Sequence, residues 1–214
     1  RRKGNLDKAI REYRTLMEDD PQDMRTLLVL ADLYVKTQKS EEALGAYKSI
    51  AYHYLKDDIY DKAVGVFKQA LNLDPADPAL RRDLGEAYHR MGRLKEAVGE
   101  YHHAQRLYAE RGDAHNQRDI LERMVRLEPE EPALRIKLAE HYIRLKMVDE
   151  AVSLFEYAAR QFEEDGRLDD YLKVMERIIF IRSKNTTLRK RVAQYYLDAR
   201  EPQKALKHLR ACFE

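Results

Sequence analysis

The stretch that decides the fold is residues 84–104, which read LGEAYHRMGRLKEAVGEYHHA. Its Tyr88 and Ala97 recur without a gap every 54 residues along the chain. The two clearest columns are Ala43, Ala97, Ala151 and Ala205, and Tyr34, Tyr88, Tyr142 and Tyr196. Units of about this length cannot bury an apolar face alone and must stack on their neighbours, so the period predicts a solenoid.

The repeat runs through all 214 residues with no linker between units. We expect one solenoid domain over residues 1–214, with a partial unit at 1–23, complete units at 24–77, 78–131 and 132–185, and a partial unit at 186–214. Both ends fall inside the repeat, and the chain begins with Arg1 in place of Met. We therefore expect a fragment of a longer protein.

Apolar residues within a unit keep helical spacing, as Leu80, Leu84 and Tyr88 do. Gly92, Gly112 and the Pro-containing segments between units are typical of helix ends, and their positions predict three helices per unit. The expected fold is all-α, a right-handed α–α superhelix of about eleven helices. They are expected near 24–37, 40–56, 59–73, 78–91, 94–110, 113–127, 132–145, 148–164, 168–182, 186–199 and 202–213. Gly45, Gly65 and Gly99 fall inside these helices, which predicts close packing around them.

These residues resemble the tetratricopeptide repeat, a 34-residue helical hairpin with a small residue and Tyr in its first helix and Ala, an aromatic and a small residue in its second. The second unit supplies Leu84, Gly85, Tyr88, Gly92, Ala97, Tyr101 and Ala104. Here the second-helix signature recurs at gaps that alternate between 34 and 20 residues. A 20-residue gap leaves no room for a separate first helix, so the middle helix of each unit must close one hairpin and open the next. We expect this doubling to disturb the regular groove of the family.

Composition excludes several classes of function. Charged residues make up 36% of the chain, and the net charge of +2 gives no general attraction for nucleic acid or anionic membrane. No apolar run could cross a bilayer, and the single Cys212 excludes an internal disulfide. His102 and His103 are adjacent and point apart on a helix, so no metal site is expected. We expect a cytoplasmic protein with no cofactor.

Catalysis is not expected either, because no serine or cysteine has a patterned base beside it. The 14 tyrosines mostly occupy repeat columns, which predicts packing and not stacking on nucleic-acid bases. Tyr52, Tyr157 and Tyr195 lie outside those columns and are the better candidates for exposed contacts.

The resemblance implies that ligands contact the inward face of each first helix. Carried onto this sequence, the candidates are Leu28, Asp32, Val35, Lys36, Arg82, Glu86, His89, Arg90, Ile136, Glu140, Ile143, Arg144, Lys190, Gln194 and Leu197. Some family members hold a C-terminal carboxylate with Lys and Asn on these helices. Three acids, Asp32, Glu86 and Glu140, stand where that clamp has Asn, which argues against it.

The expected function is therefore a non-enzymatic scaffold that binds a peptide or an amphipathic helix of another protein in its concave groove. The resemblance is strongest to bacterial arrays of this 54-residue variant. Two alternatives remain open. One is RNA or DNA binding through Arg82, Arg90, Arg144 and Lys190, and the other is a spacer or regulatory arm of a larger enzyme. The terminal helices are also expected to allow self-association, through Leu209 and Phe213 or through Leu6, Ile10 and Tyr13.

Overall fold

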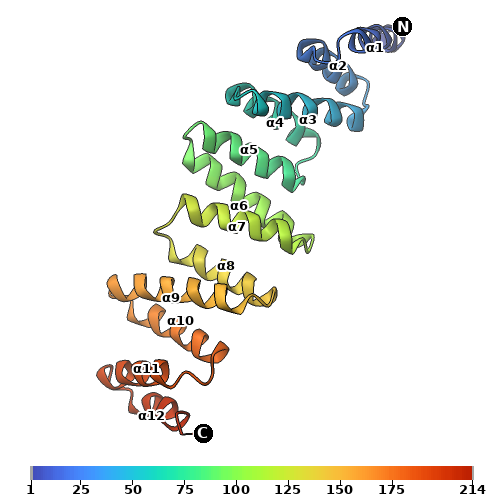
Figure 1. Cartoon of the computed structure of the whole chain (residues 1–214). Helices are drawn as coiled ribbons and strands as arrows, with labels where there is room; N and C mark the ends of the chain where they lie inside the picture. Colours follow the sequence, from blue (N-terminus) through green and yellow to red (C-terminus); the bar gives the residue numbers. More distant parts are fainter. Residues whose placement is uncertain (1, 214) are drawn as a thin grey trace. The chain divides into compact units, whose positions relative to one another are not determined.

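The computed structural model describes residues 2–213, with side chains from residue 5 onward. Within that range the chain forms twelve α-helices and no strand (Figure 1). The helices are α1 (Arg2–Asp19), α2 (Met24–Lys36), α3 (Ser40–Lys56), α4 (Tyr60–Leu73), α5 (Pro78–Arg90), α6 (Leu94–Glu110), α7 (Ala114–Leu127), α8 (Pro132–Arg144), α9 (Val148–Glu164), α10 (Leu168–Ile181), α11 (Thr186–Asp198) and α12 (Pro202–Arg210).

The all-α prediction is confirmed, and the boundaries of all but the last expected helix agree to within one residue. The last helix, α12, ends at Arg210 and not at 213. The additional helix is α1, which lies in the part assigned to the end of a preceding repeat.

The chain divides into two compact bodies, an N-terminal body up to Ile120 and a C-terminal body from Leu121 onward, with the division inside α7. In the N-terminal body α2 packs on α1 and α3, α3 also on α4, and α5 on α4 and α6. In the C-terminal body α9 packs on both α8 and α10, and α11 on α10 and α12. The middle helices α3 and α9 therefore each serve two hairpins, as the short gaps in the sequence require.

Each repeat starts its first helix with a side-chain cap. The capping residues are Asp23, Asp77, Glu131 and Asn185, spaced by 54 residues. Asp77 Oδ1 accepts hydrogen bonds from the backbone N–H of Ala79 at 2.8 Å and of Leu80 at 3.2 Å. A helix leaves its first N–H groups without internal partners, so a side-chain acceptor at this position fixes where the helix begins.

The turns between the helices of one repeat also recur with the period. At each of these turns one residue has a positive φ. Gly92, Gly112 and Gly166 have φ of 74°, 68° and 70°. At the matching positions of other repeats the chain carries Gln38, Asp58, Lys146 and Arg200, with φ between 59° and 61°. Left-handed backbone is unfavourable for residues with a Cβ, so these four turns store strain that the glycine turns avoid.

The alanine column is fully buried in the core, since Ala43, Ala97, Ala151 and Ala205 are all 0% exposed. Most tyrosines of the repeat columns are buried as expected, whereas Tyr54 and Tyr142 are only half-buried. The packing prediction for Gly45, Gly65 and Gly99 is wrong: a Cβ built on any of them would meet nothing within 4 Å. These three glycines lie on outward helix faces.

Gly85 is the glycine that allows close approach. A Cβ there would lie 2.8 Å from Cε1 of Tyr101 and 3.3 Å from the carbonyl oxygen of Ala97.

None of the helices in the described part of the chain is both long and apolar enough to span a membrane.

Candidate functional site

Asp32, Glu86 and Glu140, which occupy one repeat position of the first helices, accept hydrogen bonds from other side chains of the protein. The Tyr47 hydroxyl donates to Asp32 Oδ1 at 2.7 Å, and the Tyr101 hydroxyl donates to Glu86 Oε2 at 3.2 Å. Burial, together with the bond to Asp32, raises the pKa of Tyr47, so its hydroxyl remains a donor. These carboxylates orient the second helix of each hairpin against the first.

The third repeat breaks this column. Phe155 stands where the earlier repeats have Tyr47 and Tyr101, and it has no hydroxyl to donate. Glu140 turns instead to Arg177 of α10, whose Nε and Nη2 each donate to it at 2.8 Å. The hydrogen bonds that Arg177 donates to Glu140 raise the pKa of Arg177. A bidentate pair therefore ties α8 to α10 across α9.

An apolar pocket of about 320 Å³ opens where α8, α9 and α10 meet, and we call it the α8–α10 pocket. Its apolar lining is Ile136, Phe155, Phe162 and Val174. The two phenylalanines and Val174 are at most 5% exposed, while Ile136 is half-buried. Because Phe155 stands where the two earlier repeats have tyrosine, this position places no hydroxyl group in the pocket.

Charged groups frame the opening of the α8–α10 pocket. Glu140 and Arg177 line one part, and Asp170 and Lys173, whose Oδ1 and Nζ are 3.1 Å apart, line another. Beside Arg177 lies Phe180, which is 77% exposed, with the guanidinium 5.5 Å from its ring centroid. An apolar floor with paired charges at its rim is typical of a surface that holds one apolar side chain of a partner.

The sequence candidates do not all meet in one place. In the C-terminal body Ile136 and Glu140 line the α8–α10 pocket, and Ile143 packs on the core of that body. Arg144, Lys190, Gln194 and Leu197 are exposed and do not line it. The candidates on the first helices α8 and α11 therefore do not line one common pocket.

In the N-terminal body, Leu28 and Glu86 are half-buried. Asp32, Val35, Lys36, His89 and Arg90 are exposed. Arg90 Nε donates to Glu86 at 2.8 Å on its own helix. Arg82 Nε donates to Asp83 at 2.7 Å, and this bond raises the pKa of Arg82. Two of the four cations proposed for nucleic acid are therefore already paired with carboxylates.

Asp83 belongs to a closed polar cluster between α3 and α5. It is only 7% exposed, and its Oδ2 accepts a 2.7 Å hydrogen bond from Tyr52, whose ring packs edge-on against Phe67. Lys48 Nζ contacts the capping Asp77 at 2.7 Å in the same groove. Carboxylates buried this deeply are stable because each is hydrogen-bonded and paired with a cation.

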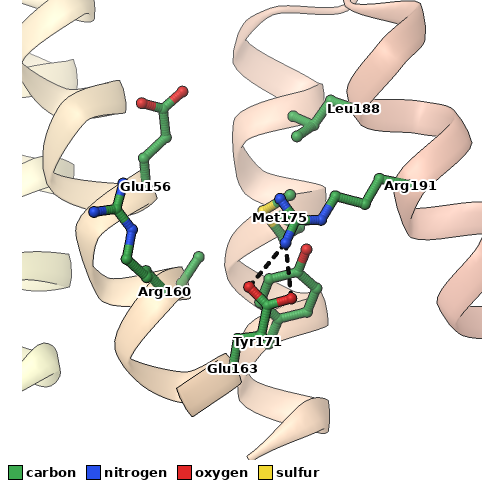
Figure 2. A pocket seen from close by; sticks show the side chains of 8 residues that line it. Glu156, Arg160, Glu163, Tyr171, Met175, Leu188 and Arg191 are labelled. Atoms are coloured by element: carbon green, nitrogen blue, oxygen red, sulfur yellow. Dashed lines mark hydrogen bonds and ion pairs between the residues drawn. The ribbon is translucent and has the colours of Figure 1, made fainter.

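A second pocket, of about 240 Å³, occupies the corresponding groove of the C-terminal body and is shown in Figure 2. We call it the arginine pocket, since Arg160 of α9 and Arg191 of α11 are among its lining residues. Arg191 Nη2 contacts both oxygens of Glu163 at 2.7 and 2.8 Å. The hydrogen bond from Tyr195, followed by that from Arg191, lowers the pKa of Glu163.

In residues 2–213 no three His, Cys, Asp or Glu side chains are grouped as ligands for a metal ion. Each of the two pockets is lined by residues of three consecutive helices of the repeat array. The model of the tetratricopeptide repeat matches residues 1–60 and 54–116, which together exceed half of the chain.

The chain belongs to the tetratricopeptide repeat family.

Several solved structures resemble this tetratricopeptide protein. The C-terminal part of a TPR repeat-containing protein from Cytophaga hutchinsonii is 13% identical, with 96% of this chain and 95% of that chain covered and a TM-score of 0.42. MamA from Desulfovibrio magneticus is 13% identical over 79% and 93%, with a TM-score of 0.41. The translocator chaperone SycD of Yersinia enterocolitica is 18% identical over 68% and 94%, with a TM-score of 0.32. A comparison with curated proteins gives no match.

Sequence reasoning from the tetratricopeptide pattern missed the residues contributed by the second and third helices. Phe162, Val174 and Arg177 line the α8–α10 pocket but lie outside the first helices. The one signal in the sequence was the replacement of Tyr by Phe155 in its column. Tyr52 and Tyr157 are exposed as expected, at 41% and 43%, but Tyr195 is half-buried, with its hydroxyl bonded to Glu163.

Proposed function

We propose that the protein is a non-enzymatic scaffold and that the α8–α10 pocket receives an apolar side chain from a peptide or amphipathic helix of a partner protein. The observation that carries this proposal is the pocket itself, with Ile136, Phe155, Phe162 and Val174 as its apolar lining and ion pairs at its rim. Its volume of about 320 Å³ is at the lower end of the range of roughly 300–1,000 Å³ found for small-molecule sites. It suits one or two side chains better than a metabolite.

Exposed apolar groups extend the surface around the pocket. Phe180 adds an aromatic face beside Arg177, and aromatic and arginine residues are the types most enriched at binding hot spots. Leu197, an exposed apolar candidate of the sequence in the same body, would provide a secondary contact. Membership of the tetratricopeptide family supports a binding role, since its stacked repeats serve as contact surfaces.

Displayed peptide libraries test this proposal while the partner is still unidentified. Peptides selected on the whole chain are measured again on Ile136→Trp, which fills the pocket without adding charge. Losing one buried apolar side chain costs about 1.5–3 kcal/mol, so affinity should fall by about 10- to 100-fold. Val148→Trp is the matched control, because Val148 is 40% exposed and does not line the pocket.

The result that rejects the α8–α10 pocket is equal binding of the selected peptides by wild type and Ile136→Trp, with both proteins folded by circular dichroism. Nucleic acid is the alternative partner, through Arg82, Arg90, Arg144 and Lys190. Binding to phosphates would weaken steeply between about 50 and 200 mM salt, whereas apolar docking would change little. If the chain is instead a regulatory arm of a larger enzyme, the same pocket would bind another domain of that enzyme.

A further inference from the structure

One ion pair divides the surface between α8 and α10, which we call the α8–α10 groove. Glu140 of α8 and Arg177 of α10 are joined by two hydrogen bonds of 2.8 Å, and α9 lies between their helices (Figure 1). α8 and α10 run in the same direction, because each forms a hairpin with α9 through a short turn. Residues at equal steps from Glu140 and from Arg177 therefore lie at the same level of the two helices.

The positions on either side of this ion pair are apolar on α8 and are repeated on α10. Four residues before it stand Ile136 and Lys173, which both line the α8–α10 pocket. Three residues after it stand Ile143 and Phe180. On each helix the two positions are seven residues apart, which is about 10 Å along an α-helix. The groove therefore has two levels, with the ion pair between them.

The second level is an apolar site of its own. Ile143 is half-buried on the core, whereas Phe180 is 77% exposed and its ring contacts the guanidinium of Arg177. In the earlier repeats the same two positions pair an apolar or aromatic residue with a polar one, as Val35 with Asn72 and His89 with Arg126. The third repeat is thus the complete repeat with aliphatic and aromatic side chains at both positions, and Phe180 extends into solvent where a partner can cover it.

The spacing of the two apolar sites selects the conformation of the partner. In an α-helix, residues i and i+7 lie on one face about 10 Å apart, with i+3 and i+4 between them on that face. In an extended strand about 10 Å corresponds to three residues, which places the two side chains on opposite faces. A polyproline helix brings i and i+3 to one face about 9 Å apart, but with no side chain of that face between them. A helix therefore matches both apolar sites and the polar level between them.

The charges around the groove favour an acidic residue at that central level. Arg167 and Lys173 both bond to the single carboxylate of Asp170, at 2.7 and 3.1 Å, and the Lys173 side chain is 74% exposed. Arg177 uses Nε and Nη2 for Glu140, so its Nη1 remains for another acceptor. These three cations and two carboxylates leave one positive charge in excess, which attracts a carboxylate and repels an ammonium group.

We propose that the α8–α10 groove holds an amphipathic helix of a partner protein, with apolar side chains at positions i and i+7 and a carboxylate at i+3 or i+4. One apolar side chain enters the α8–α10 pocket, the carboxylate lies at Arg177, and the other apolar side chain packs on Ile143 and Phe180. This inference rests on the proposed function and adds to it the helical conformation, the second anchor and the central charge.

The test uses the whole chain and three stapled alanine–lysine helices of about 15 residues, with the staple on the face opposite the anchors. The first probe has two leucines seven residues apart and a glutamate four residues after the first leucine. In the second probe the later leucine is moved back by two residues, and in the third the glutamate is replaced by lysine. By fluorescence anisotropy, we expect the first probe to bind about tenfold more tightly than the second and about threefold more tightly than the third.

Variants of the protein identify which level of the groove each leucine uses. Phe180→Ala should weaken the first probe about tenfold and leave the second unchanged, so the two probes become nearly equal. Phe213→Ala is the matched control, because Phe213 is 90% exposed and lies outside α8 and α10. Phe180→Ala should keep the wild-type melting temperature, since the side chain it truncates is exposed.

The possible failures are distinguishable. If Ile136→Trp loses the first probe while leucine spacing and Phe180→Ala make no difference, the pocket binds its partner but the second anchor is wrong. If Ile136→Trp binds the first probe as wild type does, the pocket is rejected and this inference with it. Absence of binding by the first probe would overturn the helical register, and equal binding of the first and third probes would overturn the central carboxylate.

Discussion

Replacing Gly85 by alanine tests how closely α5 and α6 approach each other. The new Cβ would lie 2.8 and 2.9 Å from Cε1 and Cδ1 of Tyr101, distances that real Cβ atoms do not show. Tyr101 is 1% exposed and cannot swing out to solvent, so the ring or the helix must shift. Such overpacking costs about 1–3 kcal/mol.

Two effects oppose each other in this variant. Alanine gains about 0.8–1 kcal/mol over glycine inside a helix. The net change for Gly85→Ala should therefore lie between zero and about 2 kcal/mol of destabilisation. The pairs Ala31 with Tyr47 and Ala139 with Phe155 stand at the same positions in other repeats, which shows that the column accepts alanine where its helices are spaced for it.

Gly99→Ala is the control, because a Cβ on Gly99 meets nothing within 4 Å and the residue is also helical. This variant should gain about 0.8–1 kcal/mol from helix propensity alone. Amide hydrogen exchange in α5 and α6 is the suitable assay, since stacked repeats can open locally and a single global transition is not assured. If Gly85→Ala stabilises α5 and α6 as much as Gly99→Ala does, the close packing of Tyr101 on Gly85 is refuted.

Further predictions concern the turns and the caps. Lys146→Gly and Arg200→Gly should each raise stability by about 0.5–1 kcal/mol by relieving positive φ, whereas Gly166→Ala should lower it by about 1 kcal/mol, as measured by thermal melting; melting temperatures that move together in all three variants would contradict the strain argument. Asp77→Asn keeps an acceptor for the helix cap but loses the ion pair with Lys48, so stability at pH 7 should fall by about 1 kcal/mol. Burial opposes ionisation of Asp77, but the bonds from Lys48 and the backbone prevail and lower its pKa; its contribution is therefore present above the ordinary aspartate pKa and is lost as the pH falls through the lowered value. Denaturant titrations at several pH values should show this loss of unfolding free energy in wild type. An equal loss at low pH in Asp77→Asn would contradict the role of Asp77.

The helices were predictable because their starts, ends and small-residue contacts all follow one period. Asp77 and its counterparts supply the caps, and Gly92 and its counterparts supply the turns, so local chemistry and repeat spacing point to the same boundaries. The end of α12 was placed too late at 213, where no further column residue constrains the chain. Packing around Gly45, Gly65 and Gly99 was predicted wrongly, because being helical does not determine which face a residue occupies.

The binding surfaces were less predictable than the helices. The family rule names positions on first helices, and it reached Ile136 and Glu140 but not Phe162 or Arg177. Those residues take part because the middle helix α9 packs on both α8 and α10, which brings a third helix into the pocket. Phe180 is recognised by comparing the repeats within the chain, since its counterparts in the other repeats are polar.

Mapping a bound peptide by amide hydrogen exchange tests the central claim most directly. A peptide selected on the whole chain is added at saturation, and protection is compared for every helix. We predict increased protection in α8 and α10, around Ile136 and Arg177, which disappears in Ile136→Trp. Protection centred on Arg82, Arg90 or Lys190, with α8 and α10 unchanged, would contradict the account.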